Sequence, residues 1–170
     1  GNASVRVGPW VVGALVACNA VGDVVDPASG RVLAGARTAD GTGLLDTQRA
    51  LLAGERGKRP LPGTNTTIGV VATNATLNKA QAKRLAMSAH DGLARSIRPA
   101  HTTLDGDTLF AMATGTEDSP PDLLLLTVMA AQATALATLN AIRQAQSIET
   151  TGGPVPAASA WQPSDKIRSL

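Results

Sequence analysis

The chain has 170 residues, of which 44% are hydrophobic and 16% charged, so its length and composition are those of one globular domain with a substantial core. A formal net charge of +2, with acidic and basic residues interspersed, and an aromatic content of only 2% argue against a nucleic-acid partner. The single cysteine, Cys18, excludes an internal disulfide and no apolar run is long enough to span a bilayer, so we expect a cytoplasmic protein without a membrane partner.

The first part of the chain has the pattern of strands joined by turns. Residues 3–7 form a short alternating run, and a longer apolar run from Trp10 to Val25 is interrupted by Asn19 and by glycines. An unpaired amide inside an apolar strand costs a few kcal/mol, about 1–3 on mutational scales. Asn19 therefore either has partners or a chemical task, or it marks a bulge or a strand end.

A loop over residues 54–65 is predicted to deliver the chain to Thr66, because glycines, prolines and charges dominate its first ten positions. Residues 68–73 then alternate as a strand that is buried on both faces or nearly so. Cleavage at such a junction would leave Thr66 as a new N-terminus, whose α-amine can serve as base to its own hydroxyl. The alternative is that Thr66 and Thr67 simply begin the strand.

Helices are predicted on either side of a second polar segment. One or two helical turns are expected between Leu44 and Leu52. Asn78 and Gln81 have the spacing of a capping box, and the apolar stripe that follows predicts a helix ending before Pro99.

A longer helix is predicted from residues 119–122 to about Ile148, with Pro120 and Pro121 in its first turn. It has hardly any polar face, which predicts burial within the domain or against other subunits. The Gly/Pro/Ser-rich residues 151–170 are predicted to form a flexible tail.

Asp105 and Asp107 form the second informative segment. In an extended chain they share a face, and two carboxylates so close repel each other unless cations, hydrogen-bond donors or a chemical task offset the cost. They are either an orienting acidic pair or a solvated Asp-Gly-Asp turn. A metal site with His101 would have only three ligands and is the weakest interpretation. His90, at the edge of the apolar stripe, is interpreted as a structural hydrogen bonder.

Four segments carry a resemblance to a known family through their order and spacing. They are residues 12–22 (VGALVACNAVG), 65–74 (NTTIGVVATN), 89–95 (AHDGLAR) and 101–115 (HTTLDGDTLFAMATG). The chain resembles the N-terminal-nucleophile hydrolases that include the L-aminopeptidase/D-amidase/D-esterase and the nylon-oligomer hydrolase. The match covers most of residues 3–150 and corresponds to the C-terminal half of the family.

The resemblance implies an α/β fold, a layered αββα sandwich of the type shared with ornithine acetyltransferase, here without its N-terminal portion. Residues 1–150 would be the C-terminal part of a self-processing hydrolase domain. The implied nucleophile is Thr66, freed by cleavage after Asn65. The implied oxyanion-stabilising amide is Asn19, and the implied orienting acids are Asp105 and Asp107. Neither a cofactor nor a metal is implied.

The implied activity is hydrolysis of small peptide or amide bonds, including those of ω-amino acid oligomers, by a homo-oligomer. Relatives complete the site with a Lys or Tyr from a stretch upstream of the point matching Gly1, and no such residue is present here. That upstream segment of the same gene product is therefore an expected partner. The alternatives are a truncated, non-catalytic homologue that acts as an assembly subunit, and an acyltransferase of the ornithine acetyltransferase type.

Overall fold

The computed structural model describes residues 1–55 and 64–160. The strands are β1 (Asn2–Val7), β2 (Trp10–Ala17), β3 (Asp23–Val25), β4 (Val32–Ala34), β5 (Ile68–Ala75), β6 (Ile97–Arg98), β7 (Thr108–Glu117), β8 (Ile148–Thr150) and β9 (Gly153–Val155). The helices are α1 (Thr47–Leu52), α2 (Lys79–Ser96) and α3 (Leu123–Arg143), followed by a short 3-10 turn at Ala158–Ala160. Helices and strands are thus mixed along the chain, as expected for the predicted α/β class.

Four strands form the main sheet in the order β1-β2-β5-β7. The pairs β1/β2 and β2/β5 are antiparallel, whereas β5 and β7 are parallel, with Ile68 opposite Thr108. Parallel neighbours cannot be joined by a tight turn, and here α2 makes the crossover between them. The consequence for the site is that β5 and β7 begin at the same edge of the sheet.

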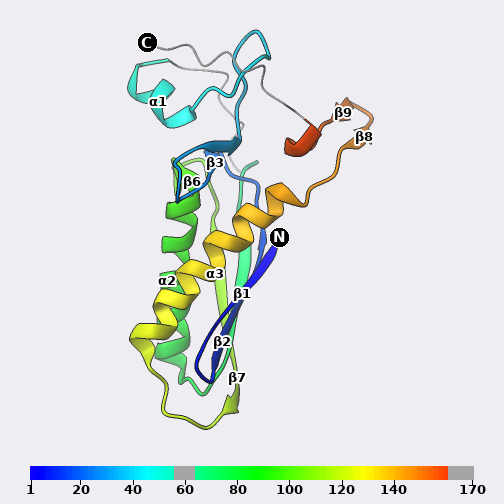
Figure 1. The fold of residues 1–170 in the computed structure, drawn as a ribbon. Coiled ribbons are helices and arrows are strands. Elements are labelled where there is room, and N and C mark those ends of the chain that lie inside the picture. Colours follow the sequence, from blue (N-terminus) through cyan, green and yellow to red (C-terminus); the bar gives the residue numbers. More distant parts are fainter. Residues whose placement is uncertain (56–63, 161–170) are drawn as a thin grey trace.

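Helices α2 and α3 pack against each other and cover one face of this sheet (Figure 1). Val12, Ala14 and Val16 alternate along β2 and point into this layer, where each is at most 5% exposed. Leu85 of α2 and Leu126 of α3 are fully buried against them. The core therefore lies between one α layer and one β layer, two of the four layers of the predicted sandwich.

The other face of the sheet is open in this chain. Leu15, Ile68, Phe110 and Met112 project from three adjacent strands, and each is between 48% and 57% exposed. The prediction that residues 68–73 are buried on both faces is therefore wrong for the described chain. The reason is that helices α2 and α3 lie on the same side, so only one face is covered.

The helix boundaries follow the capping signals. The backbone N–H of Asn78 donates to Gln81 Oε1 and the Gln81 N–H donates to Asn78 Oδ1, both at 2.9 Å, which confirms the predicted capping box. Helix α3 starts after its N-cap, Asp122, so the two prolines precede the helix instead of occupying its first turn. It also ends at Arg143, five residues before the predicted end at residue 148 (148 − 143 = 5).

Strands β8 and β9 form a hairpin across the predicted boundary between residues 150 and 151. Beyond it, Ala157 is 6% exposed and its N–H donates to Ser147 Oγ. The first part of the predicted tail thus has a defined structure, and residues 161–170 lie outside the described part of the chain.

Helix α3 is the one described helix long and apolar enough to cross a membrane by length and composition alone. Of its most apolar 18-residue window, 56% is buried inside the protein. Core helices pass the same test, so this is weak evidence for a membrane span.

A smaller sheet, β4-β3-β6, lies beyond one end of the main sheet (Figure 1). Asp23 of β3 is 1% exposed, and its carboxylate accepts hydrogen bonds from Ala36 N–H and from the N–H and hydroxyl of Thr47. These bonds attach the start of α1 to the sheet, because a buried carboxylate requires such donors.

Candidate active site

The candidate site lies where β5 and β7 begin. The residues that precede these two strands run alongside each other, and Asn65 and Asp105 form a parallel bridge. The topology thereby brings the predicted nucleophile Thr66 next to the predicted acidic pair, although 39 positions separate Thr66 from Asp105 in the sequence (105 − 66 = 39).

Thr66 is held by hydrogen bonds on both sides. Its backbone N–H donates to the carbonyl oxygen of Asn19 at 2.8 Å. Its hydroxyl donates to the carbonyl oxygen of Asn65 at 2.7 Å, and that oxygen also accepts the Gly106 N–H at 3.0 Å. The hydroxyl therefore lies next to the peptide bond at which cleavage was predicted.

Gly106 approaches Thr66 so closely that any side chain at position 106 would force the threonine hydroxyl to move. A Cβ added at Gly106 would lie 2.8 Å from Thr66 Oγ1, closer than real Cβ atoms come to such a neighbour. The missing side chain is what allows the backbone between the two aspartates to lie against the threonine hydroxyl.

Asn19 follows the end of β2 and is exposed. Its Nδ2 donates to the carbonyl oxygen of Thr64 at 2.8 Å, while its own carbonyl accepts the Thr66 N–H. Of the alternatives left open by the sequence, the structure shows a strand end whose amide has a partner. Asn19 thus holds the chain on both sides of Asn65.

The Asp105 carboxylate stabilises the turn that precedes β7. Its Oδ1 accepts the Val21 N–H at 3.0 Å, and its Oδ2 accepts the N–H and the hydroxyl of Thr102 at 3.1 and 2.6 Å. These three donors offset the cost of holding a carboxylate near Asp107.

The Asp107 carboxylate faces the start of β5. Its side chain is 4% exposed; Oδ1 accepts the Thr67 N–H at 2.9 Å, and Oδ2 lies 3.0 Å from His101 Nδ1. The two aspartates thus have different partners instead of acting on one atom. In the described part of this uncut chain, no hydrogen bond joins either carboxylate to Thr66.

His101 and His90 lie beside this carboxylate, with ring centroids 5.0 Å apart. Burial lowers the pKa of His90, and repulsion by a charged His101 lowers it further. His90 therefore belongs to the surroundings of Asp107. Within residues 1–55 and 64–160, no group of three His, Cys, Asp or Glu side chains is placed to hold a metal ion.

Thr67 and Cys18 form the buried side of the site. Thr67 is fully buried, and its hydroxyl has no nitrogen or oxygen partner and only a weak contact with the Cys18 thiol. Burial raises the pKa of the Cys18 thiol, partly offset by the neighbouring Thr67 hydroxyl. At neutral pH the thiol is therefore protonated, which does not suit it to be a nucleophile.

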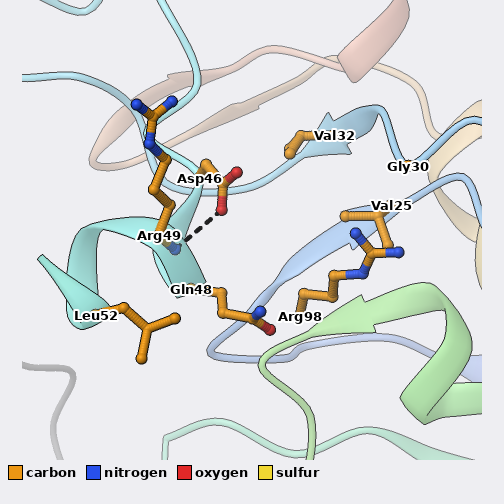
Figure 2. A pocket seen from close by; sticks show the side chains of 8 residues that line it. All are labelled: Val25, Gly30, Val32, Asp46, Gln48, Arg49, Leu52 and Arg98. Atoms are coloured by element: carbon orange, nitrogen blue, oxygen red, sulfur yellow. Dashed lines mark hydrogen bonds between the residues drawn. The ribbon is translucent and has the colours of Figure 1, made fainter.

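Figure 2 shows a surface pocket elsewhere, between α1 and the small sheet. Asp46 caps α1 there by accepting the Arg49 N–H, and the Arg98 side chain extends toward Val25 on the opposite side. Its lining contains none of the predicted site residues, so it adds nothing to the chemistry at Thr66.

Sequence reasoning gave no role to Gly106 or Thr102, and it grouped His101 with Asp107 only in the weak metal-site interpretation. The glycine between two aspartates was the available signal, since a residue without a side chain there permits close backbone approach. The side-chain partners could not be inferred, because they depend on how the turn over residues 101–107 folds.

The fold defines a class, a layered α/β protein in which two parallel strands begin at the same edge of the sheet. The family model described as peptidase family S58 matches residues 1–155, and the chain belongs to this family. It is 47% identical to an uncharacterized aminopeptidase of Mycobacterium leprae, over 87% of this chain and 45% of that protein. It is 36% identical to a 6-aminohexanoate-oligomer endohydrolase of Paenarthrobacter ureafaciens, over 71% of this chain and 34% of that protein.

Solved structures show the same fold. A β-aminopeptidase of Burkholderia sp. superimposes with a TM-score of 0.54 at 25% identity, over 92% of this chain and 45% of that one. The L-aminopeptidase D-Ala-esterase/amidase of Ochrobactrum anthropi is described as a variant of the Ntn hydrolase fold. It superimposes with a TM-score of 0.57 at 21% identity, over 92% of this chain and 44% of that one. The chain thus spans less than half the length of the relatives it matches.

Proposed function

We propose that the gene product carrying this chain is an amide hydrolase that cuts itself between Asn65 and Thr66 and then uses the freed threonine as its nucleophile. The observation that carries the proposal is the 2.7 Å contact between the Thr66 hydroxyl and the Asn65 carbonyl oxygen. This contact supports the proposal, because a hydroxyl held next to the carbonyl group at the start of a strand needs little rearrangement to attack it.

In the proposed maturation, Thr66 Oγ attacks the Asn65 carbonyl carbon. The peptide C–N bond breaks, the Thr66 nitrogen gains the hydroxyl proton, and water hydrolyses the resulting ester. In turnover, the free amine of Thr66 takes the hydroxyl proton while Oγ attacks a substrate amide. Asn19 Nδ2 then donates to the oxyanion, since departure of Thr64 from the site would free this donor.

The proposed role of the two aspartates is to position the strand starts. Asp107 holds the Thr67 N–H, and with it the residue that follows the nucleophile. Asp105 joins Thr102 to the segment after β2, which includes Asn19. Once the α-amine of Thr66 is free, these carboxylates also favour its charged form when it carries a proton.

The proposed substrates are small peptides or amides, including oligomers of ω-amino acids. Similarity to a 6-aminohexanoate-oligomer endohydrolase and to aminopeptidases supports this substrate class. We further propose that more of the same gene product covers the open sheet face, because the relatives are more than twice as long and this face is apolar. Exposed Leu124 and Val128 on α3 support the proposed homo-oligomer.

The test is intact mass and N-terminal sequencing of the protein expressed at the full length of its gene. We expect two fragments, the second beginning Thr-Thr-Ile-Gly, followed by hydrolysis of amide substrates. Thr66→Ala should stay whole and inactive. Thr67→Val is the matched control, because it removes the adjacent hydroxyl, which contacts the Cys18 thiol only weakly, and should leave the cut in place. A wild-type chain that stays whole yet hydrolyses amides would disprove the proposal.

A further inference from the structure

The carbonyl oxygen of Asn65 has two hydrogen-bond donors in the uncut chain. One is the Thr66 hydroxyl at 2.7 Å and the other is the backbone N–H of Gly106 at 3.0 Å. In the proposed self-cleavage the hydroxyl becomes the attacking group, so it can no longer donate to this oxygen. Gly106 N–H is then the remaining donor that the structure places on the atom where negative charge develops.

We propose that the Gly106 N–H is the oxyanion donor of self-cleavage, an inference that rests on the function proposed above. When Thr66 Oγ forms its bond to the Asn65 carbonyl carbon, the π electron pair moves onto the carbonyl oxygen. The pair returns as the C–N bond breaks and the hydroxyl proton passes to the Thr66 nitrogen. A donor already at hydrogen-bond distance stabilises the charged state without reorganisation.

Asn19 does not hold this position in the uncut chain. Its Nδ2 donates to the carbonyl oxygen of Thr64, one residue before the bond to be cut. Self-cleavage and turnover would therefore use different donors, a backbone amide for the first and the Asn19 side chain for the second.

The close approach at Gly106 supports the assignment independently. A side chain there would collide with Thr66 Oγ1, with Cβ only 2.8 Å from it. The backbone of residue 106 is thus adjacent to both partners of the reaction, the attacking oxygen and the carbonyl oxygen. A bridge that only pairs the backbones before β5 and β7 would need the hydrogen bond from Gly106 to Asn65. It would not need the close contact between Gly106 and the Thr66 hydroxyl.

The test deletes the one N–H and keeps the rest of the backbone. Glycolic acid incorporated at position 106 of the full-length protein replaces the N–H by an oxygen. We expect self-cleavage to slow by about 10²–10³-fold, the usual effect of losing one oxyanion donor. The matched control is glycolic acid at Gly41, another exposed glycine, whose N–H donates to the Thr38 carbonyl at 2.8 Å.

The outcomes separate the two proposals. If the wild type cleaves itself and the protein with glycolic acid at position 106 does so at the same rate, this inference is overturned while the proposed function stands. A wild-type chain that never cleaves would overturn both. Should the ester protein fail to fold, hydrogen exchange in the full-length Thr66→Val protein provides the second measurement. We expect the exposed Gly106 amide to be protected by its bond to Asn65, and rapid exchange there would contradict the assignment.

Discussion

Nδ1 of His101 lies 3.0 Å from Oδ2 of Asp107, whose other oxygen accepts the backbone N–H of Thr67. One carboxylate therefore links a partly exposed imidazole to the residue that follows the proposed nucleophile. The Asp107 side chain is 4% exposed and the His101 side chain is 37% exposed. The imidazole therefore lies between the buried carboxylate and solvent.

The first prediction concerns this contact. Asp107→Ala removes the acceptor of the Thr67 N–H, and we expect self-cleavage and turnover to fall by about 10²-fold as Thr66 loses its position. Asp107→Asn keeps an acceptor oxygen and should retain more activity than the alanine variant. Fragment formation over time, measured by mass, checks both variants. Equal rates in Asp107→Ala and wild type would refute the positioning role.

The second prediction separates the two roles assigned to Asn19. Asn19→Ala should fold and should lower amide turnover by about 10²–10³-fold through loss of an oxyanion donor. Self-cleavage should slow less, because Asn19 Nδ2 bonds Thr64 and not the Asn65 carbonyl in the uncut chain. Asn140→Ala is the control, since its exposed Nδ2 also donates to a backbone carbonyl, that of Asn2 at 2.8 Å. Wild-type turnover in Asn19→Ala would remove this residue from the mechanism.

The third prediction is a pH dependence of stability that arises from His90. Burial and a charged His101 lower its pKa below the ordinary 6.5, although Asp107 and Asp91 act in the opposite direction. The folded protein then binds fewer protons than the unfolded chain just below pH 6.5, so stability present above 6.5 is lost as pH falls.

Urea denaturation at several pH values checks this dependence. As the pH falls below 6.5, the free energy of unfolding should decrease more steeply in wild type than in His90→Gln. His101→Gln should retain part of the slope, because burial is the larger cause of the shift. Parallel curves for wild type and His90→Gln would contradict the assignment.

The fourth prediction concerns the open sheet face. Met112 on this face and Met87 on α2 are 53% and 52% exposed in the described chain. If further residues of the gene product cover the face, Met112 should resist peroxide oxidation in the full-length protein while Met87 reacts. Peptide mass mapping of both methionines makes the comparison within one sample. Equal oxidation of the two would mean that the face stays open.

The fifth prediction concerns the buried hydroxyl of Thr67. Since this hydroxyl makes no hydrogen bond beyond a weak contact with the Cys18 thiol, Thr67→Val should leave stability unchanged or raise it by about 1 kcal/mol. Thr138 is equally buried, but its hydroxyl donates to the Thr134 carbonyl at 2.9 Å, so Thr138→Val should destabilise by about 1 kcal/mol. Thermal unfolding of the two variants provides the test. A large loss in Thr67→Val would reveal a partner for this hydroxyl.

Much of the fold could be predicted from sequence because local signals agree with the tertiary structure. The capping box at Asn78 and the alternating run at residues 3–7 predict a helix and a strand without knowledge of their neighbours. The end of α3 was misplaced, because the apolar pattern continues past Arg143 to Ile148, which pairs in a strand instead. The open face could not be predicted. An apolar pattern in a strand does not reveal whether helices of the same chain cover one face of the sheet or both.

The candidate site was predicted in part. The four segments identified the family, and the parallel pairing of β5 and β7 brings Thr66 next to the turn over residues 105–107. The catalytic roles of Thr66, Asn19, Asp105 and Asp107 stay predictions, as does a cytoplasmic location. Asp105 accepts a hydrogen bond from Thr102, whereas Asp107 accepts one from Thr67. These different partners depend on the three-dimensional geometry of the turn, which no residue pattern encodes.

The position of β5 in the middle of the main sheet determines what a cut before it would produce. One product would carry β1 and β2 and the other β5 and β7, yet six residue pairs from Val12↔Thr73 to Ala17↔Ile68 join β2 to β5. Helix α3, in the second product, packs on β1 and β2 of the first. The two polypeptides would therefore remain one folded particle, a heterodimer made from a single chain, with its subunit boundary running through the centre of the sheet.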